Sequence, residues 1–438
     1  MSVSPQTAGK PVLRDAGYCR LALWRARPEG IPMWRQIKSG AWLTPERLHG
    51  YALIMLAVSL TIVVIWTALA DGLIDRNGKP IGTDFTNVWA AGKLVLDGEP
   101  AAPYDPVLQH EAEKQTFGGR EVPFYGWHYP PLFLLVAAGL ALLPYGWALL
   151  AWMALTLPAY LMVIRTIVPR PETLLVAVAF PAVLVNLGHG QNGFLTAALL
   201  GSGLVLLDNR PALAGVLIGL LAYKPQFGVL IPLVLVATAR WRVIAAATTT
   251  VLAAGALTSV LLGPSVWIAF AHSTEFTRTV VIESGGAGWP KIQSLFSAVR
   301  MWGGGVEAAY VAQAALALVV AASLVWLWRS PAAQDLKAAA LSCACLLTTP
   351  YVLDYDLMAL AVAIAFFVRF GFAHGFRDYE LSVLSLAWAA PLFARSVAGA
   401  AGIPLGLMAM LMLYGLTLRR AAIDLGARAQ TRERALQA

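Results

Sequence analysis

Long apolar runs, separated by short polar or basic segments, fill most of the chain from Tyr51 onward. An α-helix needs roughly 17–25 mostly apolar residues to cross a bilayer, and unpaired backbone amides cannot face lipid. The pattern therefore predicts an all-α polytopic membrane protein, although several runs are shorter than a full crossing. The runs cover residues 51–70, 130–143, 147–165, 173–187, 194–207, 211–223, 227–239, 243–262, 308–328, 338–349, 357–370, 381–394 and 403–418.

Lysines and arginines gather between alternate runs, which orients the predicted helices. Cytoplasmic loops are enriched in these residues, so we expect both chain ends to be cytoplasmic. The alternation holds only if 130–143 does not cross, so this run is predicted to be re-entrant or interfacial, which gives about twelve spans; thirteen is the alternative. The basic segments lie at 165–170, 208–210, 240–242, 329–337, 369–377 and 419–420.

The polar segments divide the chain. We expect a basic cytoplasmic tail at 1–49, a transmembrane domain at 50–420 and a cytoplasmic tail at 421–438. The domain would hold two large outer loops, 72–129 and 263–306, and the run Phe85 to Leu96 in the first could form a short interfacial helix. The tail before Tyr51 lacks the apolar core of a cleaved signal peptide.

Composition agrees with a membrane protein. Hydrophobic residues make up 58% of the chain and charged residues 13%, about half the charged share of a soluble domain. The net charge of +8 comes from residues at predicted helix ends, so it does not indicate a nucleic-acid partner. The three cysteines, Cys19, Cys343 and Cys345, show no disulfide or metal-binding spacing.

Asp84 stands in the polar loop after the first apolar run, in the stretch Gly82 to Trp89. A carboxylate at the membrane face can accept a proton from a sugar hydroxyl within about 2.6–3.2 Å, as a general base does. Thr83 and Asp84 also precede an apolar run, which is typical of a helix N-cap. The residues alone leave both interpretations open.

Four other polar segments share the predicted outer face with Asp84: 188–192, 223–226, 264–306 and 349–356. Polar groups are costly at membrane depth, so this gathering favours an active site there. Lys224 and Lys291 could neutralise a leaving phosphate, or they could snorkel to the interface. The candidates for sugar or acceptor binding are His128, Tyr129, His189, Gln191, Asn192, Gln226, Gln293, Asp354 and Asp356.

Each of these candidates also has a structural interpretation, as a belt residue, a polar hairpin turn or a helix start. Asp354 and Asp356 stand two residues apart, as in the D-x-D pair that holds a divalent metal in some sugar-nucleotide enzymes. A lone match is a weak signal. We therefore predict no cofactor and no metal site, with a divalent metal as the alternative.

Together these stretches resemble glycosyltransferase family 87, a family of the GT-C class of integral-membrane glycosyltransferases. Its members include polyprenol-phosphate-mannose-dependent α-mannosyltransferases. The resemblance covers roughly Asp84 to Arg420, and it rests on the order and number of the stretches because no single one is specific. The matching stretches are Asp84-Phe85, 90–92, 104–106, 129–131, 190–193, 224–226, 291–294, 350–351 and 354–356.

The resemblance implies a GT-C-like bundle with a long first extracytoplasmic loop, in the cell membrane. It also implies an inverting transfer of a hexose, with mannose as first choice, from a polyprenyl-phosphate donor to a membrane lipid or glycan acceptor. Asp84 occupies the position of the general base. Lys224, and Lys291 as second choice, would then meet the charge that grows on the leaving phosphate.

Two other function classes fit a polytopic protein with polar membrane segments. A transporter or flippase of lipid-linked sugars needs polar sites along a path open to both faces, and a non-catalytic scaffold has no need of Lys224 or His189 in apolar surroundings. The polar motifs gather on one predicted face. This distribution favours an enzyme.

Overall fold

The computed structural model describes residues 32–437, and all regular elements among them are helices. The predictions made for residues 1–31, including the basic tail and Cys19, lie outside the described residues. Within these residues, seven helices are long and apolar enough to cross a membrane. They are α3 (Pro45–Ala68), α7 (Tyr145–Ile167), α13 (Trp241–Leu262), α16 (Val306–Arg329), α18 (Ala359–His374) with the turn η8 (Asp354–Met358) before it, α19 (Glu380–Ala401) and the membrane part of α20 (Leu405–Gln437).

Shorter helices fill the space between these seven. Some are apolar, and others lie in the two large polar segments. They are α2 (Met33–Ser39), α4 (Phe85–Leu96), α5 (Pro106–Thr116), α6 (Leu134–Ala141), α8 (Thr173–Val178), α9 (Pro181–His189), α10 (Gly193–Leu206), α11 (Pro211–Leu220), α12 (Leu230–Ala237), α14 (Ser265–Phe276), the π-helix η6 (Thr277–Glu283), α15 (Leu295–Met301) and α17 (Gln334–Leu347). Single turns are η2 (Ala102–Tyr104), η3 (Pro131–Phe133), η4 (Leu221–Tyr223), η5 (Pro225–Gly228) and η7 (Trp289–Lys291).

The predicted membrane protein is confirmed in class, but the count of about twelve spans is not confirmed. Seven predicted runs coincide with the seven long helices. The other six form shorter helices, and Pro181 divides the run 173–187 into α8 and α9. The run 130–143 becomes η3 and α6, eleven residues in all, which cover only about 16 Å at 1.5 Å per residue.

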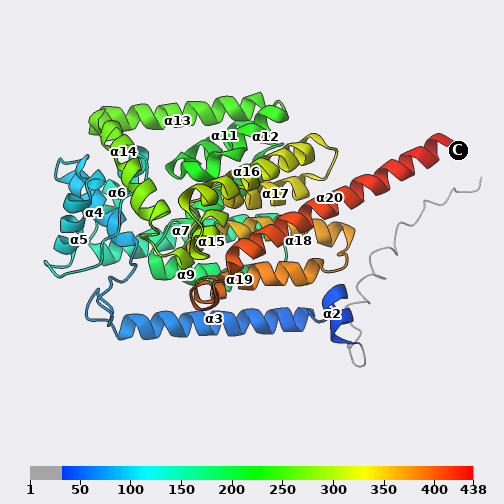
Figure 1. Ribbon diagram of the computed structural model, residues 1–438, viewed down its shortest axis with the longest axis horizontal. Helices are drawn as coiled ribbons and strands as arrows, with labels where there is room; N and C mark the ends of the chain where they lie inside the picture. Colours follow the sequence, from blue (N-terminus) through cyan, green and yellow to red (C-terminus); the bar gives the residue numbers. More distant parts are fainter. Residues whose placement is uncertain (1–31, 438) are drawn as a thin grey trace, which may run out of the picture.

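The long helices run along the long axis of the molecule (Figure 1). The helices α3 and α13 lie at opposite edges of the body, and α4 and α5 gather at one end. The helix α2 and the C-terminal end of α20 both lie toward the other end, apart from each other. The core lies between these edges, where α17 and α18 pack together with most of their side chains buried.

The first predicted outer loop is a folded layer rather than an open loop. The run Phe85 to Leu96 is helical with the predicted bounds, but its first half is buried against α6 and does not lie free on the surface. Gly92 is essential to this packing, because a Cβ there would collide with the backbone carbonyl of Ala137. At the far end of the layer, Asp105 caps α5 by accepting hydrogen bonds from the amides of Val107 and Leu108. The layer therefore holds the residues around Asp84 in fixed positions.

The second large segment is also structured. The helices α14 and η6 lead to a turn at Gly285, and η7 and α15 follow. Ile292 pairs with Leu353 through an isolated β-bridge, and the amide of Gln293 donates to the carbonyl of Val352 at 2.7 Å. This pairing places Lys291 beside the 351–356 segment.

Candidate active site

Asp84 occupies the N-cap position of α4, but its side chain makes no capping hydrogen bond. The carboxylate instead faces residues from distant parts of the chain. Lys291 Nζ lies 3.2 Å from Oδ2 and 3.4 Å from Oδ1, and the Gln191 amide donates to Oδ2 at 3.3 Å. His189 Nδ1 lies 3.5 Å from Oδ1. The N-cap interpretation is therefore wrong for the side chain, which belongs instead to this polar cluster.

The charges around Asp84 keep it ionised although it is buried. Only 7% of the residue is exposed. Burial by itself raises the pKa of this carboxyl, but the Lys291 ammonium and His189 outweigh it and hold the pKa well below its usual range. This carboxylate would take up a proton near neutral pH only if Lys291 moved away or lost its charge.

Two glycines let the turn between α9 and α10 approach Asp84. Gly190 ends α9 with φ +61°, and a Cβ there would lie 2.6 Å from the Cβ of Phe85, next to Asp84. Gly193 opens α10, and a Cβ there would lie 2.8 Å from the carbonyl oxygen of Tyr355. Asn186 locks the same turn, donating to the Tyr355 carbonyl at 2.9 Å and accepting from the Gly193 amide at 2.9 Å. Gly190 and Gly193 are thus needed because a side chain at either position would collide with a neighbouring segment.

A polar network continues from this turn into the protein. The Tyr129 hydroxyl donates to Gln191 Oε1 at 3.1 Å and accepts from the Asn192 amide at 2.8 Å. Asn192 Oδ1 is buried and has no partner among the described residues. A buried acceptor without a donor is costly, so this atom is suited to a hydroxyl of a bound molecule.

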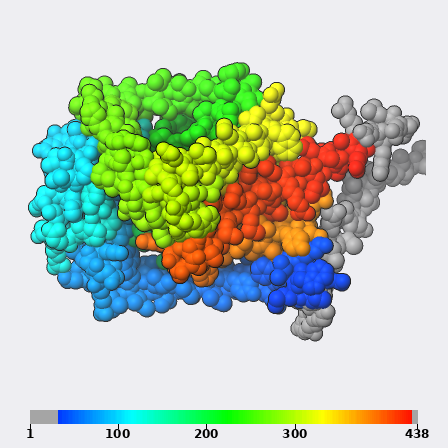
Figure 2. Space-filling model, in the orientation of Figure 1, coloured from blue at the N-terminus to red at the C-terminus, as the bar shows by residue number. Residues whose placement is uncertain are grey.

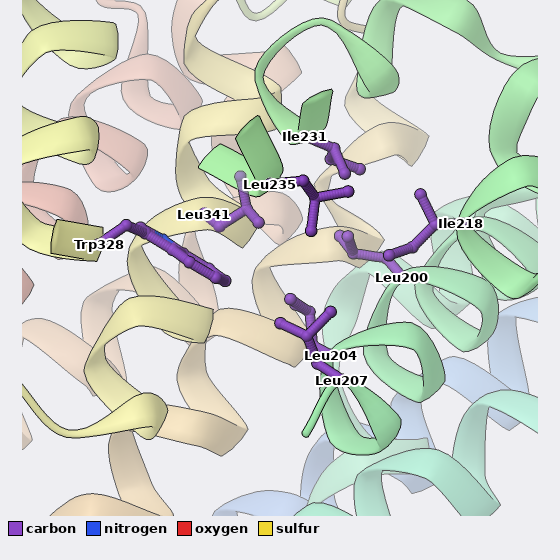
Figure 3. A pocket seen from close by; sticks show the side chains of 8 residues that line it. All are labelled: Leu200, Leu204, Leu207, Ile218, Ile231, Leu235, Trp328 and Leu341. Carbon is purple, nitrogen blue, oxygen red and sulfur yellow. The ribbon is translucent and has the colours of Figure 1, made fainter. Parts of the chain in front are cut away.

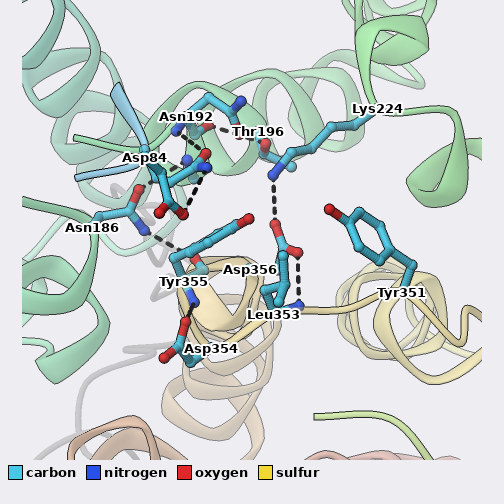
Figure 4. Close-up of polar contacts among 12 residues, drawn as sticks. Asp84, Asn186, Asn192, Thr196, Lys224, Tyr351, Leu353, Asp354, Tyr355 and Asp356 are labelled. Carbon is cyan, nitrogen blue, oxygen red and sulfur yellow. Dashed lines mark hydrogen bonds and ion pairs between the residues drawn. The ribbon is translucent and has the colours of Figure 1, made fainter. Parts of the chain in front are cut away.

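Lys224 and Asp356 form a second ion pair close by. Lys224 Nζ lies 2.6 Å from Asp356 Oδ1, and both side chains are almost fully buried. Asp356 Oδ2 accepts from the Leu353 amide at 3.0 Å. The Tyr355 ring lies between the two lysines, with its centroid 5.1 Å from Lys224 Nζ and 5.4 Å from Lys291 Nζ. Figure 4 shows this pair facing the same space as Tyr355.

The two carboxylates of the D-x-D pair diverge. Asp356 points toward Lys224, whereas Asp354 points away from it (Figure 4). Asp354 Oδ1 accepts from the Tyr355 amide, and Oδ2 lies 3.9 Å from Arg395 on α19. Over residues 32–437, no group of three His, Cys, Asp or Glu side chains could hold a metal ion. The pair is therefore arranged for two different cations of the protein.

The remaining candidates lie at different distances from this centre. His128 Nδ1 pairs with the Thr277 hydroxyl at 2.8 Å, and burial lowers its pKa to about 4, so the ring is neutral at pH 7. The Gln293 amide donates to the carbonyl of Pro290 at 2.7 Å, which makes it a loop-holding residue. Gln226 is half-buried in η5. The structure thus unites Asp84, Tyr129, His189, Gln191, Asn192 and Lys291, with the Lys224–Asp356 pair beside them.

Several residues of the site were not predicted. Thr83 pairs with His189 Nδ1 at 2.8 Å, and Glu113 of α5 is fully buried, accepting from the Tyr125 amide at 3.0 Å. Arg395 had the clearest signal, because it is a lone cation in an apolar stretch. Glu113 had none, since it stands among other charged residues in a polar helix.

The cavity drawn in Figure 3 is separate from the polar cluster. It is too narrow to hold a water molecule and is lined by seven leucines or isoleucines and Trp328. Leu204 and Leu207 lie at the end of α10 opposite Asn192. Its walls carry no chemistry for group transfer.

The sequence of this site agrees with a known family. The model of glycosyltransferase family 87 matches residues 127–350, slightly more than half of the chain. The match includes Tyr129, the 188–193 turn, Lys224 and Lys291, and Asp84 precedes it. No curated protein and no solved structure matches the chain. The family match and the multi-pass helical fold agree, and the chain belongs to glycosyltransferase family 87.

Proposed function

We propose that this membrane glycosyltransferase moves a hexose, with mannose as first choice, from a polyprenyl-phosphate donor to an acceptor hydroxyl, with inversion and with Asp84 as the general base. The observation that carries the proposal is the environment of Asp84. Its carboxylate is buried and ionised, makes no helix cap, and lies beside a lysine, a histidine and the amide of Gln191. A buried ion with such partners has a cost that a structural role does not explain.

The reaction uses these groups in one displacement. Asp84 accepts the proton of the acceptor hydroxyl, and the hydroxyl oxygen forms a bond to the anomeric carbon as the bond from that carbon to the phosphate oxygen breaks. The electron pair of the broken bond stays on the polyprenyl phosphate, and the transition state resembles an oxocarbenium ion. Attack on the face opposite the phosphate turns a β-linked donor into an α-linked product.

Lys291 is our first choice for the leaving phosphate, and Lys224 is the second. This reverses the order expected from the sequence. Lys224 is held by Asp356 at 2.6 Å inside the protein, whereas Lys291 Nζ contacts Asp84 at 3.2 and 3.4 Å. When Lys291 turns toward the growing phosphate charge, Asp84 loses its main counter-charge and becomes a stronger base. One movement thus supports both halves of the reaction.

The amide network next to Asp84 is our candidate sugar site. Asn192 Oδ1 lacks a donor, and Gln191 lies between Asp84 and Tyr129. Each hydroxyl group of a hexose can both donate and accept a hydrogen bond, so a bound sugar could pair with these amides. His189, which lies in edge contact with the Tyr355 ring, and the neutral His128 border the same region. The acceptor, a membrane lipid or glycan, would approach Asp84 from the side of the folded layer formed by residues 72–129.

The site is proposed to face the extracytoplasmic side of the cell membrane. The ends of the described chain, α2 and the C-terminal end of α20, both lie toward the end opposite α4 and α5 (Figure 1). Basic residues surround that end, including Lys38, Arg377 and Arg420. Lysine and arginine enrichment is typical of the cytoplasmic face, and this favours two cytoplasmic termini.

A transport function receives less support. The helices α17 and α18 lie in the middle of the bundle and are filled with buried apolar side chains, whereas transport needs a polar path open to each face in turn.

The test uses purified protein, radiolabelled polyprenyl-phosphate mannose and a lipid extract as acceptor source, with nucleotide-linked mannose as the alternative donor. The proposal expects a labelled product from the lipid-linked donor that α-mannosidase cleaves. Labelling from the nucleotide sugar alone would contradict it. Movement of the donor across reconstituted vesicles without a new product would instead establish a flippase.

A further inference from the structure

One corner of the molecule gathers the ends of two long helices and the start of a core helix. The helix α13 begins at Trp241, α16 ends at Arg329, and α17 begins at Gln334. Figure 2 shows the green surface of α12 and α13 beside the yellow surface of the α16–α17 region, and α12 contacts both α16 and α17. Both α13 and α16 are long and apolar enough to cross a membrane, so we expect this corner to lie at a membrane–water interface.

Arg240 is the central cation of this corner. Its Nη1 donates to Asp208 Oδ1 at 2.7 Å, and the central carbon of its guanidinium lies 5.9 Å from the centroid of the Trp328 ring. Its Nε is buried and has no hydrogen-bond partner among residues 32–437. A buried donor without an acceptor is costly. The contact with Asp208 therefore leaves part of the guanidinium unsatisfied.

The turn that carries Arg240 is strained. Ala239 adopts φ +53°, in the left-handed region that favours glycine. The amide of Arg240 donates to the carbonyl of Leu235 at 2.9 Å, and this bond closes the end of α12. Strained backbone conformations gather at functional positions. The turn holds Arg240 in place at a cost that an ordinary surface arginine does not require.

A second cation approaches Arg240 from α17. Lys337 is half-buried, and burial together with the charge of Arg240 lowers its pKa, although Asp208 opposes both effects. Gln334 stands one helical turn before Lys337, so both lie on one face of α17. The Nε2 atom of Gln334 is also buried without an acceptor in the described part of the chain. Hydrogen-bond donors thus outnumber acceptors at this corner.

The charge balance at the corner favours an anion. Asp335 at the start of α17 is already paired with Arg369 of α18. Arg240 and Lys337 therefore share Asp208, of which 53% of the side chain is exposed. Exposed arginines stand near these residues in the chain, at Arg210 and Arg242. The enrichment of basic residues that sets membrane topology explains exposed arginines, but it does not explain two partly buried cations that repel each other.

The surroundings of the two cations are apolar. Val236 and Trp241 stand on either side of Arg240 in the chain and are 54% and 61% exposed, and tryptophan is enriched at membrane interfaces. Behind Arg240, Trp328 and Leu207 line the narrow cavity of Figure 3. Because this cavity is too narrow for a water molecule, the apolar part of a ligand would lie along the exposed side chains instead.

We propose that Arg240, Lys337 and Gln334 form a site for the phosphate group of an anionic phospholipid of the surrounding membrane. The phosphate oxygens accept hydrogen bonds from the guanidinium, the ammonium and the amide, and an arginine can hold a phosphate with two parallel bonds. Basic pockets between transmembrane helices bind acidic lipid head groups in this way. The acyl chains pack along Val236 and Trp241. The bound lipid joins the α12–α13 turn to the start of α17.

This lipid site is separate from the candidate active site. Asn192 precedes α10 and Asp208 follows it, and the 14 residues of α10 lie between them, which is about 21 Å at 1.5 Å per residue. The inference therefore does not depend on the function proposed above, and its test needs no measurement of sugar transfer.

The test titrates the purified full-length protein in a neutral detergent with phosphatidylglycerol and counts bound lipids by native mass spectrometry. Arg240→Gln/Lys337→Gln removes both cations of the site, and the control Arg210→Gln/Arg242→Gln removes the same charge at exposed neighbours. We expect at least tenfold weaker binding of phosphatidylglycerol in the first variant and less than a twofold change in the control. Equal weakening in both would mean a diffuse attraction and would overturn the site, as would equal binding of the zwitterionic phosphatidylcholine.

Two single variants separate binding from folding. Lys337→Gln leaves the pair of Arg240 and Asp208 intact and should still weaken the binding of phosphatidylglycerol. Asp208→Asn removes the carboxylate that competes with the phosphate, so it should tighten binding, a gain that a damaged fold cannot produce; weaker binding would contradict the proposal. Inorganic phosphate is the second probe. If it displaces phosphatidylglycerol at equal concentration, the site belongs to free phosphate and the assignment to a lipid is wrong.

Discussion

Replacing Lys291 by methionine removes the main counter-charge of the candidate base while keeping much of the side-chain volume. Lys291 Nζ lies 3.2 Å from Asp84 Oδ2, and only 13% of the lysine side chain is exposed. At this distance and an effective dielectric constant of about 20, the pair attracts by about 5 kcal/mol. Losing one partner of a buried pair costs roughly 3–5 kcal/mol unless the other takes up a proton.

We expect Asp84 to take up that proton. In the unaltered protein its pKa is held well below the usual range, so protonation of Asp84 should not reduce activity near neutral pH. In Lys291→Met the lysine charge no longer opposes the effect of burial, so the pKa of Asp84 rises. Activity should then fall as the pH is lowered through the new pKa. Loss of the phosphate partner should also lower kcat by about 100-fold.

The assay is kcat/KM for the lipid-linked donor between about pH 5 and pH 9, where the pH profile reports groups of the free enzyme. Lys93→Met is a control, because Lys93 is exposed and pairs with Asp97 on the outside of α4. Lys291→Arg should restore part of the activity. A Lys291→Met profile with the same acidic limb as the unaltered protein would refute the electrostatic coupling of Lys291 and Asp84.

Three further changes test the surroundings of the site. Burial raises the pKa of Glu113 from 4.5 to about 8, so the folded protein holds a proton that the unfolded chain releases; thermal stability should fall as the pH rises through this window, and Glu113→Gln should flatten the dependence. Gly190→Ala forces a Cβ to 2.6 Å from that of Phe85 at φ +61°; we expect a stability loss of at least 1–2 kcal/mol from the backbone conformation alone and a larger loss of activity, measured by denaturation and transfer assays. Lys224→Met should destabilise the fold by roughly 3–5 kcal/mol, and adding Asp356→Asn should recover part of that stability; additive losses would contradict a mutually compensating pair.

The hydrophobic pattern predicted where helices lie better than it predicted which of them are long enough to cross a membrane. The runs that became α3, α7 and α16 are long and largely unburied, so length and composition identify them. The runs that became α10 and α17 are buried among other helices. Burial makes a helix apolar on all sides whatever its length, so composition could not distinguish a short core helix from a membrane span.

The candidate site shows a similar division. The sequence predicted that polar residues from distant segments gather in one place, and the structure brings Asp84, His189, Gln191 and Lys291 into contact. The sequence could not predict that Lys291 pairs with Asp84, because the two residues stand 207 positions apart in the chain. Only the folded structure shows that Lys224 already has a buried partner in Asp356.

The measurement that tests the central claim most directly compares the unaltered protein with Asp84→Asn. Asparagine keeps the shape and the contact with Gln191 but cannot accept the proton. With radiolabelled polyprenyl-phosphate mannose and a lipid extract, only the unaltered protein should form a new labelled glycan, while both proteins bind polyprenyl phosphate equally. Transfer by Asp84→Asn at a rate close to that of the unaltered protein would contradict the assignment of Asp84 as the base.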